Sequence, residues 1–65
     1  MSRYDELVKS FMMSRFNATE VKILRIHESE EVTEVSGEVK MSGVRKRFTV
    51  LIRKDDDSIM GYGLR

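Results

Sequence analysis

The chain has 65 residues, a net charge of +1, no cysteine and a single histidine. Without cysteine it forms no disulfide, and one histidine is too few for a zinc site built from the usual nitrogen and sulfur ligands within one chain. A chain this short buries only about 60% of its unfolded surface, so we expect one small domain over residues 1–65. No apolar run reaches the roughly 20 residues of a membrane span, and we expect a cytoplasmic protein with no membrane partner.

Residues 3–16 predict an amphipathic helix, because their apolar side chains recur at the spacing of helical turns. The apolar stripe comprises Tyr4, Leu7, Val8, Phe11, Met12 and Phe16. Ser2 and Asp5 have the spacing of a capping box at the start of the helix, and Asn17 suits a left-handed residue at its end. We expect the stripe to pack on the core of the domain.

Residues 19–28 predict a first strand whose apolar positions do not alternate regularly. Val21 and Ile23 share one phase of a strand, whereas Leu24 and Ile26 share the other. Either both faces of this strand are partly covered, or a bulge near Ile23 and Leu24 switches the phase. The polar residues that follow the strand predict a turn.

Residues 32–41 and 44–54 predict two antiparallel strands that form a hairpin with Ser42 and Gly43 at its tip. In this register one face of the hairpin is apolar and the other is charged. A slip of one residue would mix the two faces, so the pattern specifies the register. The apolar face carries Val35, Val39, Phe48, Val50 and Ile52.

The same register makes two pairs across the hairpin that can be checked individually. Glu38 lies opposite Arg47, which places opposite charges side by side. Gly37 lies opposite Phe48, and we expect the aromatic ring to cover the bare backbone of the glycine.

The remainder of the chain predicts a polar turn at 55–58 and a short apolar segment at 59–64. This segment forms either a fourth strand or an irregular tail. The order of elements predicts a two-layer α+β domain, in which an N-terminal amphipathic helix packs on one face of a three- to four-stranded antiparallel β-meander.

Several short motifs resemble catalytic or ligand-binding sites but lack residues that such sites require. Asp55–Asp57 lacks the spaced ligands and the distal glutamate of a calcium loop. The glycines of Gly61-Tyr62-Gly63 are not followed by a helix that could bind phosphate. His27 lies beside Glu28, but the sequence offers no nucleophile or oxyanion hole near them. We therefore predict no metal, no cofactor, no catalytic residue and no enzymatic activity.

The basic residues of the hairpin are the strongest functional signal. We expect most of them on the charged outer face of the sheet, and Lys46 beside the tip on the inner face. The predicted partner-binding residues are Lys40, Arg45, Lys46, Arg47, Leu51 and Arg53. Because the sequence contains no recognisable catalytic, metal or cofactor site, the leading hypothesis is a small non-enzymatic protein-interaction module of the accessory, adaptor or inhibitor type.

The alternative hypothesis is a nucleic-acid-binding protein that uses the same lysines and arginines. A twisted ribbon with a basic tip can follow phosphates or enter a groove. Against this hypothesis, Glu34 and Glu38 share the outer face, no outward aromatic residue offers stacking, and the net charge is small.

The predicted topology also separates charges along the strands. The two turns at one end of the sheet carry Glu28, Glu30, Glu31 and Asp55–Asp57, whereas the basic hairpin tip lies at the other end. Such polarity steers charged partners and favours head-to-tail contacts between copies. An exposed strand edge can pair with a partner strand or with a second copy, so self-association is a further hypothesis.

Overall fold

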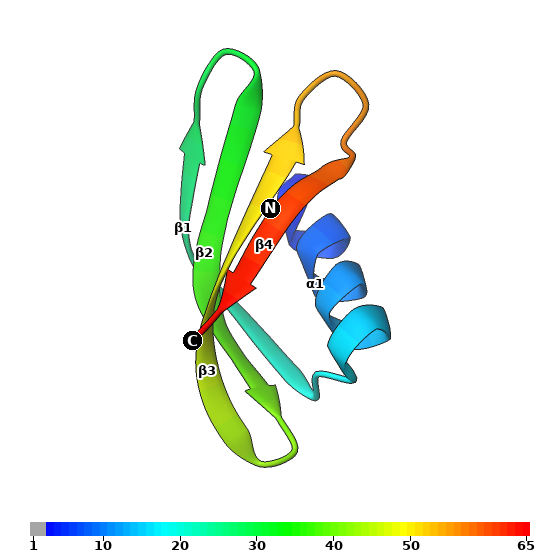
Figure 1. Cartoon of the computed structure of the whole chain (residues 1–65), viewed down its shortest axis with the longest axis vertical. Helices are drawn as coiled ribbons and strands as arrows, with labels where there is room; N and C mark the ends of the chain where they lie inside the picture. Colours follow the sequence, from blue (N-terminus) through cyan, green and yellow to red (C-terminus); the bar gives the residue numbers. More distant parts are fainter. Residues whose placement is uncertain (1–2) are drawn as a thin grey trace.

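The computed structural model describes residues 3–65 and shows one helix packed on a single antiparallel sheet (Figure 1). The sheet has four strands in the order β1-β2-β3-β4. The elements in chain order are α1 (Arg3–Phe16), β1 (Glu20–Glu28), β2 (Val32–Met41), β3 (Val44–Arg53) and β4 (Ile59–Leu64). The predicted α+β meander is confirmed, and residues 59–64 form its fourth strand.

Helix α1 buries Tyr4, Val8 and Met12 in the core, and the other members of the predicted stripe, Leu7, Phe11 and Phe16, pack against it partly buried. Asp5 in the first turn complements the positive end of the helix dipole. Asn17 ends the helix in the left-handed conformation, with φ of 55°, as predicted for the helix end. Ser2, the other half of the predicted capping box, lies outside the described residues.

The β2–β3 hairpin has the predicted register. Val35 lies opposite Val50, and the Glu38–Arg47 pair is also as predicted. Ser42 and Gly43 have φ of 51° and 77°, and two consecutive left-handed residues are what a two-residue hairpin loop requires. Strand β3 ends at Arg53, one residue earlier than predicted.

Strand β1 contains the bulge that was one of the two alternatives. Its pairing with β2 shifts register between Ile23 and Arg25, so Leu24 is the extra residue. Leu24 is accordingly 59% exposed. On either side of it, Val21, Ile23 and Ile26 all pack against the core. The bulge therefore keeps the apolar residues of both halves of β1 on the same face.

The bulge explains the glycine in the middle of β2. A Cβ atom at Gly37 would overlap the carbonyl oxygen of Lys22 and would lie 3.0 Å from the Cα of Ile23. Phe48 does lie opposite Gly37. The requirement for glycine, however, arises from the close approach of the β1 backbone, and the expectation that it arises from the Phe48 ring is corrected.

The core lies between α1 and the inner face of the sheet. Its buried apolar residues are Tyr4, Val8, Met12, Ala18, Val35, Val39, Phe48, Val50 and Ile52. Thr33 is also fully buried, and its hydroxyl donates a hydrogen bond to the Tyr4 hydroxyl at 3.0 Å. The core predicted from the sequence did not include Ala18 or Thr33, because neither residue belongs to a strongly apolar pattern.

The two turns that join β1 to β2 and β3 to β4 lie at one end of the molecule, and the hairpin tip lies at the other (Figure 1). The longest dimension is 36 Å. Lys54 connects the two turns, because its backbone N–H donates to Glu31 at 3.0 Å and its Nζ atom pairs with Glu28 at 3.2 Å. Within residues 3–65, the one helix is too short and too polar to cross a membrane.

Gly37→Ala should destabilise the fold by about 3 kcal/mol, because the new methyl group forces β1 away from β2. Gly63→Ala is the matched control, since a Cβ atom there meets nothing within 4 Å. We expect the control to change the free energy of unfolding by less than about 0.5 kcal/mol. Urea unfolding monitored by circular dichroism compares the two variants, and equal stabilities would contradict the role given to Gly37.

Candidate functional site

The face of the sheet that α1 does not cover is called the outer face below. Its side chains alternate along each strand with the buried residues of the core. The cationic residues that β1, β2 and β3 place on the outer face are Lys22, Arg25, Lys40, Arg45, Arg47 and Arg53, and Arg65 joins them opposite Arg47. Its acidic residues are Glu20, Glu34 and Glu38. Cations outnumber acids, so the face carries a net positive charge.

The predicted site residues lie together on the outer face, except for Lys46, which was expected on the inner face. The four outer-face cations predicted from the hairpin lie on β2 and β3, together with Leu51, which is 38% exposed. Lys46 lies opposite Val39 and so belongs to the inner face beside the tip. A flat partner on the outer face would not contact Lys46.

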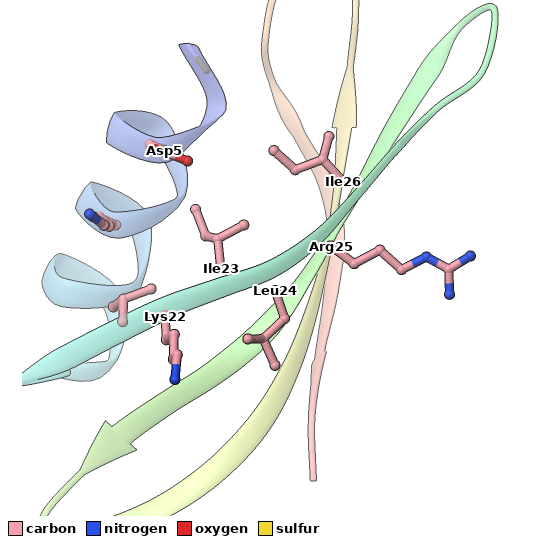
Figure 2. A pocket seen from close by; sticks show the side chains of 8 residues that line it. Asp5, Lys22, Ile23, Leu24, Arg25 and Ile26 are labelled. Carbon is pink, nitrogen blue, oxygen red and sulfur yellow. The ribbon is translucent and has the colours of Figure 1, made fainter. Parts of the chain in front are cut away.

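Sequence reasoning missed Lys22 and Arg25, which β1 adds to the outer face. Lys22 lies opposite Glu38, and Arg25 lies opposite Ser36. Figure 2 shows the Arg25 side chain directed away from α1, whereas Ile23 points toward the helix. Residues three apart occupy opposite faces of a regular strand, and the bulge alone puts these two cations on the same face. The broken apolar alternation of β1 was the signal that could have revealed them.

Most of the outer-face cations have no ion pair among the residues that the structure describes. The exception is Arg45, whose Nη1 atom lies 3.4 Å from the Oε1 atom of Glu38. This pair is long and solvent-exposed, so it contributes little to stability. The charges of Lys22, Arg25, Arg47 and Arg53 are therefore available to a binding partner.

The outer face is shallow across its centre. One row of paired residues crosses the four strands there. It begins at Arg25 on β1 and continues with three small residues, Ser36, Thr49 and Gly63. The depression beside this row has a volume of about 220 Å³ and is lined by Arg25, His27, Glu34 and Ser36. A broad, shallow, charged surface suits a macromolecule, because a small ligand needs a deeper pocket to bury most of its own surface.

A groove of about 500 Å³ runs between α1 and β1 (Figure 2). Val21, Ile23 and Ile26 supply its apolar lining, and Asp5 and Lys9 contribute from the helix. The groove is open to solvent, and four of its eight lining residues are charged: Asp5, Lys9, Lys22 and Arg25. Within residues 3–65, moreover, no group of three or more potential metal ligands is close enough to hold an ion.

The acidic end of the molecule has its own local order in the β3–β4 turn. The backbone N–H of Ser58 donates to the Oδ1 atom of Asp56 at 3.1 Å. Hydrogen bonds from the Ser58 side chain and then from its backbone hold the pKa of Asp56 below the ordinary value of 3.8. The stabilisation of the turn by this carboxylate is therefore present above pH 3.8 and is lost as the pH falls through the lower pKa of the folded chain.

Ser58→Ala should raise the pKa of Asp56 toward its ordinary value, because the variant removes the hydroxyl but keeps the backbone donor. Ser29→Ala is the control: it removes a hydroxyl from the other turn at the same end, where Ser29 bonds to Val32. An NMR titration of the Asp56 carboxyl carbon measures both variants. An unchanged Asp56 pKa in Ser58→Ala would show that the hydroxyl is not the main cause.

Comparison of the chain with protein-family models, with curated proteins and with solved structures found no match. No family or structural neighbour therefore supplies a function. We infer the function of this protein from the chemistry of its own surfaces.

Proposed function

We propose that this protein is a small non-enzymatic binding module, of the adaptor or inhibitor type, whose outer face and hairpin tip dock on an acidic surface of a protein partner. The observation that supports this proposal is the outer face itself. No described part of the chain covers it, and most of its cations have no ion pair. The positive charges of this face are therefore available for electrostatic recognition of a partner.

Exposed apolar side chains among these cations favour a protein partner over a nucleic acid. Leu51 lies between Arg47 and Arg53 on β3, and Leu24 is exposed at the β1 bulge. Protein interfaces combine apolar contacts in the centre with a polar rim, and arginine is enriched in them. Sheets that bind single-stranded nucleic acid use aromatic rings for stacking, and no Phe, Tyr or Trp of the described chain lies on the outer face.

The separation of charge along the strands supports a directed encounter with the partner. The basic tip and the acidic turns lie at opposite ends of a molecule 36 Å long. Salt screens charges over roughly 8 Å under physiological conditions, so the two ends act as separate patches. An acidic partner is attracted to the tip and repelled by the far end. Because the chain has no cysteine, we place this encounter in the reducing cytoplasm.

The double charge reversal Arg45→Glu and Arg47→Glu should abolish partner binding. The immobilised protein is exposed to an extract of the cells that express it, and captured proteins are identified and tested again in purified form. Lys9→Glu with Ser10→Glu is the control, because both side chains are exposed on the helix, and the pair changes the net charge in the same direction away from the outer face. We expect the control to retain the partner and the outer-face variant to bind it at least tenfold more weakly, a difference of about 1.4 kcal/mol.

Lys46→Glu refines the assignment, because Lys46 belongs to the same tip but to the inner face. We expect Lys46→Glu to retain most of the binding. Equal capture by the outer-face variant and the wild type would refute the proposed surface. If the wild type instead shifts duplex DNA or single-stranded RNA, with affinity that falls steeply as salt rises, the nucleic-acid alternative replaces the protein partner.

A further inference from the structure

Strand β4 is an edge of the sheet, and one side of its backbone has no partner among residues 3–65. Arg65 and Arg47 exchange backbone hydrogen bonds of 2.9 and 3.3 Å. Because hydrogen-bonded and non-hydrogen-bonded pairs alternate in an antiparallel ladder, Gly63 also faces β3. The N–H and C=O groups of Tyr62 and Leu64 therefore point outward from the sheet.

The two edges of the sheet differ in how they are protected. The β1 edge carries a bulge at Leu24 and the cations Lys22 and Arg25, which are common means of preventing strand pairing. Strand β4 has the sequence IMGYGL, without a charge or a proline. Its register is irregular only at its start, and the segment from Gly61 to Leu64 pairs regularly with β3. The β4 edge is thus open to a further strand.

An aromatic cluster adjoins this open edge on the inner side. The ring of Tyr62 lies 5.5 Å from that of Phe11 and 5.3 Å from that of Phe16, measured between centroids. Tyr62 is nevertheless 46% exposed, and the two phenylalanines are only partly buried. Apolar surface at the rim of the core gains stability when a neighbouring molecule covers it.

The charges at the two ends of β4 favour a second copy of the same strand. Asp55–Asp57 precede β4, and Arg65 follows it. When two β4 strands run antiparallel about a two-fold axis near Gly61, Arg65 of each copy lies beside the Asp55–Asp57 turn of the other. Within this turn Asp57 already pairs with Arg3 of its own chain at 2.7 Å, so among the described residues Asp55 and Asp56 supply the unpaired acidic charge. The same arrangement sets the basic end of one domain against the acidic end of its partner. A self-complementary patch of this kind is what a two-fold interface requires.

We propose that β4 pairs with β4 of a second copy, so that two four-stranded sheets join into one continuous antiparallel sheet. A two-fold axis perpendicular to the sheet reverses the strands but keeps both helices on one face. The two Tyr62 clusters then meet across the axis and bury the exposed aromatic surface. Both outer faces stay open and lie next to each other, so dimerisation and partner binding through the outer face are compatible.

The solution mass tests this dimer. We expect sedimentation equilibrium to show a concentration-dependent rise from 7.6 kDa toward twice that mass. Tyr62→Lys places two charges near the axis and should weaken association at least tenfold. Arg65→Glu should also weaken it, and it leaves the backbone pairing of Arg65 with Arg47 intact. Leu24→Lys is the control, because it adds the same charge to the opposite edge.

Amide hydrogen exchange gives a second, site-specific readout. Exchange of the Tyr62 and Leu64 amides should slow as protein concentration rises, while the exposed β1 edge shows no such dependence. A wild-type mass of 7.6 kDa up to roughly 1 mM would overturn the proposal. So would a dimer that Leu24→Lys dissociates and Tyr62→Lys does not.

Discussion

The contact between the β1 bulge and Gly37 organises this small domain. The Lys22 carbonyl and the Ile23 Cα occupy the space that any side chain at position 37 would need. This close approach lets β1 bend over the inner face of the sheet while its two halves keep their apolar residues in the core. In a chain of 65 residues, few other contacts can compensate for apolar residues turned to solvent.

The same bulge determines the chemistry of the opposite face. It aligns Lys22 and Arg25 with the cations of the hairpin, so that one sheet surface collects positive charge from three strands. The core and the candidate binding surface are therefore two consequences of one irregularity in the β-ladder. Bulges commonly redirect side chains in this way near functional surfaces.

The two edges of the sheet have different sequences and, in our interpretation, different roles. Strand β1 is bent, charged and unsuited to pairing, whereas β4 is short, uncharged and rimmed by the half-exposed Tyr62. Because the core of this protein is small, association through the open β4 edge would add buried surface and backbone hydrogen bonds that one copy lacks. A dimer through β4 would enlarge the core and join two basic faces, since strand pairing leaves both faces of a sheet accessible.

The sequence by itself determined the elements whose evidence is local. The helix stripe, the hairpin register and the left-handed tip follow from periodicity and turn chemistry, which neighbouring residues specify. Only the tertiary structure decided which way β1 accommodates its broken alternation, why Gly37 is required, and that Thr33 and Tyr4 form a buried hydrogen bond. These features depend on atoms from segments far apart in the chain. The bulge also determines that Arg25 lies on the outer face, so the extent of the basic surface could not be predicted from local sequence patterns.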